Sequence, residues 1–180
     1  MKYCKLCFLF IITLCFQNVI AQTATNNTYA VIVGVSNYES IGIRKLKFAN
    51  NDAQNFYNYL LSKSGGSVPP RNMKLLLDEE ASFAAIYQEL KWLLKKAKKD
   101  DLVYFYFSGH GDMENTTIYK LGFLLAQNTP RTNYINNALR IEDLNYYANT
   151  LSTKNQAKVV LITDACHSGI LQVMISGEIN

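Results

Sequence analysis

The chain has 180 residues, 49% of them hydrophobic and 18% charged, which suits one globular domain with a buried core. Its 18 lysines and arginines face 14 aspartates and glutamates. This small excess of positive charge gives no reason to expect nucleic-acid binding.

The first residues of the chain differ in composition from the rest. Lys2 and Lys5 precede an apolar run over residues 6–16, and medium or small residues come just before Gln22. This order is typical of a secretory signal peptide. The apolar run, about 11 residues long, is too short to cross a hydrocarbon layer of roughly 30 Å.

These features predict three segments and an exported protein. We expect residues 1–21 to be a signal peptide, residues 22–28 a polar leader, and residues 29–180 the folded domain. The mature protein would be secreted or periplasmic, with no stable membrane span. An uncleaved membrane anchor is the alternative.

Removal of the signal peptide changes the charge and the cysteine count. Without Lys2 and Lys5, 18 − 2 = 16 basic residues face 14 acidic ones, a net charge of about +2. Only Cys166 of the four cysteines remains, so it is a free thiol, an intermolecular partner or a working nucleophile. The two histidines, His110 and His167, would need carboxylates to complete a zinc site. We expect no metal and no other cofactor.

Alternating strand and helix patterns run along the domain. Continuous β-branched or aromatic runs are typical of buried strands, and apolar residues at helical spacing indicate amphipathic helices. In chain order the patterns predict a strand over 29–35, a helix over 50–61, a strand over 73–77, a helix capped by Ser82 and running to about 98, a strand over 102–107, an irregular stretch over 112–140 with a strand or hairpin arm at 119–125, a helix over 141–151 and a strand over 158–163. This order predicts an α/β fold with a mostly parallel sheet and helices on both faces.

Two buried strands are followed by residues with catalytic chemistry. His110 follows the strand over 102–107, and Cys166 follows the strand over 158–163. Ligands of open α/β sheets bind beyond the carboxyl ends of the strands. If the two strands are neighbours, about 4.8 Å apart, their loops face each other. A histidine could then activate the thiol as its base.

The neighbours of these two residues fit the same chemistry. Gly109 and Gly111 flank the histidine, which lets the backbone approach a ligand and admits positive φ. The N–H groups of Gly111 and Cys166 could stabilise an oxyanion. His167 directly follows the cysteine, so its side chain should point elsewhere and serve a structural role. Alone, the cysteine could be an inert apolar residue and His110 a turn residue.

The motifs around both residues resemble a known family. FSGHG at 107–111 and DACHSG at 164–169 are similar to the histidine and cysteine motifs of the caspase and metacaspase superfamily. Caspases carry Q-A-C-[RQG]-G with a histidine about 50 residues upstream; here 166 − 110 = 56 residues separate the two. The segments YAVIVGVSNY and 46–60 also resemble this family, over about residues 29–172. The resemblance implies a three-layer caspase-like sandwich.

The resemblance also implies an activity. His110 would assist attack of the Cys166 thiolate on a peptide carbonyl, and water would release the acyl-enzyme. Asp164 matches the aspartate that lines the S1 pocket of metacaspases, where caspases carry glutamine, and Asp52 and Ser108 match other pocket positions. Two carboxylates would favour Arg or Lys in the substrate. The plainer interpretations are a helix-dipole partner for Asp52 and a turn-capping residue for Asp164.

The chain departs from the family at its end. It stops 14 residues after Cys166, where relatives continue into further strands. We therefore expect a domain that is incomplete at its C-terminus. Either the gene product is truncated, or the missing part comes from a C-terminal partner or from a second copy in a homo-oligomer. No acidic cluster for calcium is visible, and calcium dependence stays unknown.

Two kinds of function remain open. The first is a cysteine endopeptidase that acts on protein or peptide substrates. The second is a catalytically silent caspase-like module that binds or assembles with a partner. A serine α/β-hydrolase is excluded because G-x-S-x-G is absent, and dinucleotide binding because G-x-G-x-x-G is absent.

Overall fold

The structure is a computed structural model, and it describes residues 26–113 and 121–165. The predicted signal peptide and most of the predicted leader lie outside the described residues. The predicted export and the segment boundaries therefore stay predictions.

The elements along the chain match the expected order. They are β1 (Thr28–Gly34), α2 (Ala49–Leu61), η1 (Pro70–Asn72), β2 (Met73–Leu77), η2 (Asp78–Glu80), α3 (Phe83–Lys96), β3 (Leu102–Ser108), β4 (Gly111–Met113), β5 (Gly122–Leu125), β6 (Ala138–Arg140), α4 (Ile141–Thr153) and β7 (Lys158–Asp164). Each long predicted helix and strand is present with bounds that agree to within two residues. Ser82 caps α3 as expected, since its side chain accepts a hydrogen bond from the Ala85 N–H.

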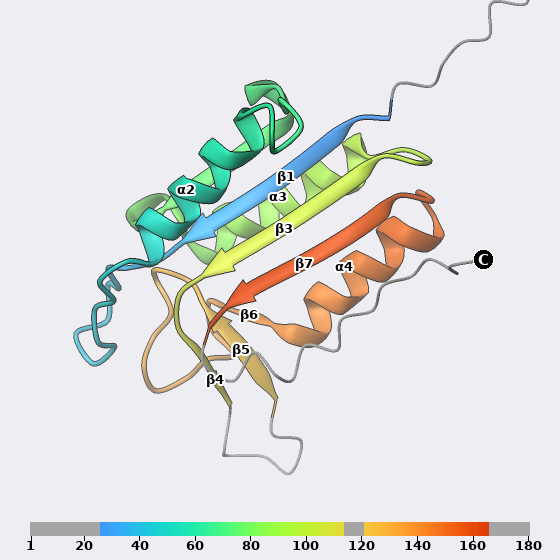
Figure 1. Cartoon of the computed structure of the whole chain (residues 1–180). Helices are drawn as coiled ribbons and strands as arrows, with labels where there is room; N and C mark the ends of the chain where they lie inside the picture. The colour runs from blue at the N-terminus through green and yellow to red at the C-terminus, as the bar shows by residue number, and fades with distance from the viewer. Residues whose placement is uncertain (1–25, 114–120, 166–180) are drawn as a thin grey trace, which may run out of the picture.

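The stretch predicted as irregular contains more order than expected. Besides β5, which falls inside the predicted arm at 119–125, it holds β4 and β6, and the three strands form an antiparallel sheet in the order β4-β5-β6. Strands of three or four residues are too short to show a clear period of two, so the pattern missed them. This small sheet lies beyond the arrowheads of the main sheet (Figure 1).

The main sheet has the strand order β2-β1-β3-β7, and every pair is parallel. β1 and β3 lie in the middle of the sheet, and their sequences are almost continuously apolar. A strand that is covered on both faces has no side chains facing solvent, so neither face needs polar residues. β7 lies beside β3 and is half-exposed among the described residues.

Helices cover both faces of this sheet, as predicted. α2 lies on one side and α3 and α4 on the other (Figure 1). On the α2 side, Ala53 and Leu60 pack with Ile32 and Tyr106. On the other side, α3 and α4 contribute five buried residues to a larger core around Phe105 and Phe107: Ile86, Leu90, Leu93, Leu144 and Leu151. The three-layer α/β architecture is therefore confirmed.

The start of α2 lies unusually close to the end of β1. A Cβ atom placed on Gly34 would lie 2.6 Å from the Cβ of Ala53 and 2.7 Å from the carbonyl oxygen of Ala49, so only glycine fits there. The Ser36 hydroxyl, just after β1, accepts a hydrogen bond of 3.0 Å from the Asn50 N–H. Both contacts fix the first turn of α2 against the carboxyl end of the sheet.

The helices of the described part of the chain are all too short or too polar to cross a membrane.

Candidate active site

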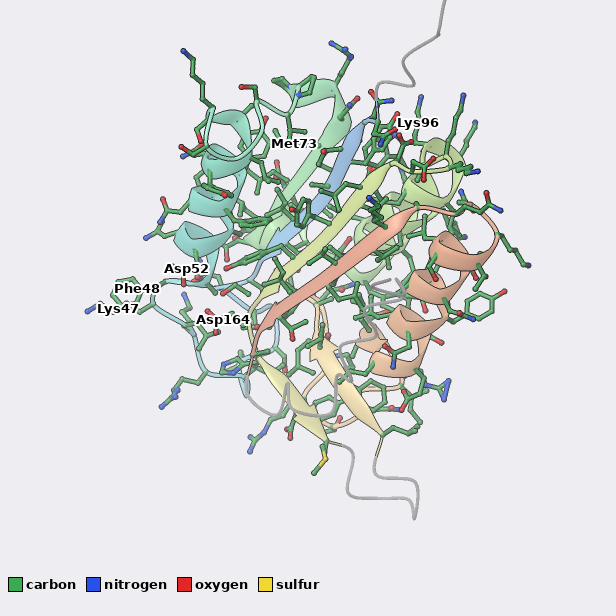
Figure 2. The ribbon with its side chains drawn as sticks, turned by 45° about the vertical axis from the view of Figure 1, so that its right-hand side comes forward. Lys47, Phe48, Asp52, Met73, Lys96 and Asp164 are labelled. Carbon is green, nitrogen blue, oxygen red and sulfur yellow. The ribbon has the colours of Figure 1, made fainter. Side chains whose placement is uncertain are left out.

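The carboxyl ends of three strands bring the predicted site residues to one edge of the sheet. Gly34 of β1 pairs with Ser108 of β3, and Ser108 pairs with Asp164 of β7. Laterally paired residues of parallel strands point to the same face, which here is the α2 face. Asp52 and Asp164 lie at the same end of the sheet, opposite the end marked by Lys96 (Figure 2).

The two motif-bearing strands are neighbours, which is the condition for their loops to face each other. β3 and β7 pair along their whole lengths, and the Gly109 N–H then donates a hydrogen bond of 3.2 Å to the Asp164 carbonyl oxygen. The segment that leads to His110 thus stays beside the end of β7. Cys166 and His167, including the Cys166 backbone N–H, lie outside the described residues.

The imidazole ring of His110 is oriented by a hydrogen bond. Its Nε2 atom lies 2.7 Å from the carbonyl oxygen of Arg44, in the loop between β1 and α2. A carbonyl oxygen only accepts hydrogen bonds, so Nε2 is the donor, and in the neutral ring Nδ1 is then the basic nitrogen. A half-exposed histidine held in this way can act as a general base through Nδ1.

The backbone of His110 is held as firmly as its ring. Its N–H donates a hydrogen bond of 2.7 Å to the Tyr38 hydroxyl, and its carbonyl oxygen accepts one of 2.9 Å from the Leu125 N–H. The Tyr38 and His110 rings also lie 5.2 Å apart between centroids. Three segments from different parts of the chain therefore meet at this histidine.

Gly109 has a different role from the one predicted. It does not adopt a positive φ. Instead, a Cβ atom at this position would lie 2.9 Å from the Phe107 ring and 3.0 Å from the Tyr38 hydroxyl. Glycine is needed here because the tyrosine packs directly over the backbone, and not because of an unusual backbone conformation.

The backbone N–H of Gly111 is directed away from the small sheet. Gly111 pairs with Leu124 of β5, and the neighbouring Leu125 N–H bonds to the His110 carbonyl oxygen. In an antiparallel ladder this arrangement makes Gly111 and Leu124 a pair that exchanges no hydrogen bonds with each other. The Gly111 N–H is therefore not used by β5, as an oxyanion donor requires.

The three predicted pocket residues all act on one hydroxyl group, that of Tyr106 in β3. Burial raises the pKa of Tyr106 above its usual 10.0, and the negative charges of Asp164 and then Asp52 raise it further. A hydrogen bond from Ser108 opposes this shift. The ring of Tyr106 stacks on Phe56, with centroids 4.6 Å apart and planes at 15°.

This stack explains how α2 brings Asp52 near the Tyr106 hydroxyl. Phe56 follows Asp52 by four residues, so both lie on the same side of the helix. The stack anchors that side of α2 over Tyr106, and the carboxylate of Asp52 comes within electrostatic reach of the Tyr106 hydroxyl. Asp52, which is half-buried, and Asp164, which is exposed, come from elements far apart in the sequence, and both act on this hydroxyl.

Several residues of the site were not predicted from the sequence. Tyr106 could have been found, because it precedes Ser108 by two residues and so shares its face of β3. Tyr38 and the carbonyl group of Arg44 gave no signal, since both lie in a loop without periodicity. Over residues 26–113 and 121–165, no group of three histidine, cysteine, aspartate or glutamate side chains could hold a metal ion.

Comparison with known proteins identifies the family. A family model described as the caspase domain matches residues 27–178. Metacaspase-1A of Aspergillus oryzae is 26% identical over 165 residues, which cover 82% of this chain and 36% of the relative. Metacaspase-1 of Eremothecium gossypii is 25% identical over 162 residues, which cover 81% of this chain and 32% of the relative. The chain spans about a third of the length of these curated relatives.

A solved structure shows the same fold. The crystal structure of protein GSU0716 from Geobacter sulfurreducens matches with a TM-score of 0.61 at 16% sequence identity, covering 79% of this chain and 51% of that chain. At this identity the likeness shows the fold alone, and it confirms the expected caspase-like α/β architecture. Because the family model matches most of its length, the chain belongs to the caspase-domain family of cysteine peptidases, with metacaspases among its relatives.

Proposed function

We propose that the chain is a cysteine-type endopeptidase in which Cys166 is the nucleophile and His110 its base, and that it cleaves after Arg or Lys. The observation that carries this proposal is the hydrogen bond between Nε2 of His110 and the Arg44 carbonyl oxygen. It leaves Nδ1 as the nitrogen that can act as base, on a segment whose backbone bonds to the end of β7, two residues before Cys166.

The proposed mechanism uses only groups of this chain. Nδ1 of His110 takes the thiol proton of Cys166, and the thiolate attacks the substrate carbonyl carbon. The N–H groups of Gly111 and Cys166 donate to the resulting oxyanion. The imidazolium then protonates the leaving amine, and water hydrolyses the acyl-enzyme with His110 again as base.

The preference for a basic residue rests on the acidic pocket. The carboxylates of Asp52 and Asp164 both act on the Tyr106 hydroxyl, and the Ser108 hydroxyl bonds to it. Two negative charges that act on the same hydroxyl disfavour a substrate carboxylate and stabilise an ammonium or guanidinium group through charge-assisted hydrogen bonds. We therefore expect cleavage after Arg or Lys and not after Asp.

The test uses the full chain and its Cys166→Ala and His110→Ala variants. Each is incubated with a fluorogenic peptide that ends in Arg and a matched one that ends in Asp, under reducing conditions, with and without calcium. We expect cleavage after Arg by the unchanged chain and none by either variant, with the circular dichroism spectrum preserved.

Two results would count against the proposal. Turnover retained by Cys166→Ala would show that the cysteine is not the nucleophile. A folded, unchanged chain that cleaves neither peptide would instead favour the silent binding module.

A further inference from the structure

The loop between β1 and α2 makes hydrogen bonds with both the ring and the backbone of His110. The Arg44 carbonyl oxygen accepts from the ring Nε2 at 2.7 Å, and the Tyr38 hydroxyl accepts from the backbone N–H at 2.7 Å. The Leu46 N–H closes the loop with a hydrogen bond of 2.9 Å to the Ser36 carbonyl oxygen. One loop therefore sets both the place of the histidine backbone and the direction of its ring.

The part of this loop that carries the tyrosine is fixed from two sides. Directly after β2, the Asp78 carboxylate accepts hydrogen bonds of 2.8 Å from the N–H groups of Ser36 and Asn37. On the other side, the Glu39 N–H donates a hydrogen bond of 2.9 Å to the Gln127 carbonyl oxygen. Tyr38 lies between these hydrogen bonds, so a shift of its backbone would break at least one of them.

The surroundings of Tyr38 also hold its side chain in place for the hydrogen bond with His110. It is only 8% exposed and belongs to the core on the α3 side of the sheet. Its hydroxyl approaches the backbone so closely that Gly109 has no space for a side chain. Burial raises the pKa of Tyr38 well above its usual value, so the phenol stays protonated at neutral pH. Its oxygen accepts the hydrogen bond from the His110 N–H.

We propose that Tyr38 is a positioning residue of the active site: its hydroxyl fixes the backbone of His110 and thereby sets the direction of Nδ1, the nitrogen that acts as base in the proposed function. The inference rests on the proposed function, in which His110 is the base. Phenylalanine at this position would keep the ring packing but leave the His110 N–H without its acceptor. The histidine would then shift, and small misplacements of a catalytic group lower the rate strongly.

The test compares Tyr38→Phe with Tyr87→Phe. Tyr87 also makes one short phenol hydrogen bond, of 2.6 Å to Asp143, but it joins α3 to α4 away from the site. We expect Tyr38→Phe to lower kcat for the Arg peptide by about tenfold or more with KM changed less than about twofold. Tyr87→Phe should lower the melting temperature and leave kcat unchanged. Equal loss of kcat in both variants, or in neither, would overturn the proposal.

A second measurement does not depend on turnover. Nitrogen-15 NMR of the His110 ring should show a single Nε2–H tautomer in the unchanged chain and in Tyr87→Phe, and mixed tautomers in Tyr38→Phe. Ring signals that Tyr38→Phe leaves unchanged would overturn the positioning role. Absence of cleavage by the unchanged chain would instead defeat the proposed peptidase activity, while the ring signals would still decide the role of Tyr38.

Discussion

Asp164 and Asp52, the two carboxylates of the proposed pocket, lie on different kinds of element, and this difference matters for their substitution. Asp164 ends the exposed strand β7, whereas Asp52 lies in the first turn of α2, where it also faces the helix dipole. Removing the Asp52 charge therefore changes helix stability as well as the pocket. Asp164 is the cleaner probe of substrate preference.

Asp164→Asn should reduce kcat/KM for Arg and Lys peptides by about 10- to 100-fold, because a charge-assisted hydrogen bond becomes a neutral one. Peptides with a neutral residue at the same position should lose less than about threefold. Asp100→Asn is the matched control: Asp100 lies at the opposite end of β3 with a φ of 67°, which asparagine adopts readily. Equal losses for basic and neutral peptides would remove Asp164 from the pocket.

The sequence could predict these side chains but not what holds them. His110, Ser108 and Asp164 follow apolar strands, so the geometry of a parallel sheet places them at one edge. The hydrogen bonds that hold the histidine come from Tyr38 and Arg44. Both lie in a loop, where the sequence shows no periodic pattern. Contacts of this kind depend on the whole fold and not on local pattern.

Among the elements, the contact between β1 and α2 tolerates the least change. Gly34 lies against backbone atoms of α2, which cannot rotate away as a flexible side chain can. Long elements such as α2 and β3 were predictable from their period, and three-residue strands such as β4 were not.

Gly34→Ala should lower the free energy of unfolding by about 1–3 kcal/mol, because the added methyl group overlaps Ala53 and the Ala49 carbonyl group. Urea unfolding measures this loss. Gly42→Ala is the control, since its added methyl group meets only the flexible side chain of Arg131, and we expect a smaller loss. If the two variants are equally stable, the contact between α2 and β1 is looser than described.

One buried carboxylate stabilises the opposite end of the sheet, where β1, β3 and β7 begin. Asp101, 4% exposed, accepts hydrogen bonds of 2.8 Å from the N–H groups of Asn27 and Lys98. Its own carbonyl oxygen accepts one of 2.8 Å from the Lys158 N–H. The start of β1, the end of α3 and the start of β7 therefore meet at this residue.

Asp101→Ala should cost about 2–4 kcal/mol of unfolding free energy, because both backbone N–H groups lose a charged acceptor. Chemical denaturation provides the measurement. The site lies at the other end of the strands, so kcat at a temperature where the variant stays folded should not change. A loss of kcat without a loss of stability would contradict this separation.

For the whole molecule, buried phenols set the response to alkaline pH. Burial is the largest cause that raises the pKa of five tyrosines: Tyr38, Tyr87, Tyr106, Tyr134 and Tyr147. The folded state holds these protons more tightly than the unfolded chain, whose tyrosines titrate near pH 10. Stability from this source is complete below that pH and is lost as the pH rises through the folded pKa values.

We expect the urea midpoint to fall between pH 10 and pH 12, and Tyr134→Phe to make that fall less steep. Burial and the hydrogen bond to Asp112 raise the pKa of Tyr134 to about 12. Phenylalanine has no proton to lose, so its share of the pH dependence disappears. An equally steep fall in the variant would show that Tyr134 does not contribute.

The order of the strands also determines when the site can exist during synthesis. Ser108 pairs with Asp164, which follows it by 164 − 108 = 56 residues. A ribosome that adds 5–20 residues per second needs about 3–11 s to make that stretch. Until then a growing chain can pair β1, β2 and β3 but lacks Asp164. The parallel sheet thus keeps the residues of the candidate site apart until β7 has been made.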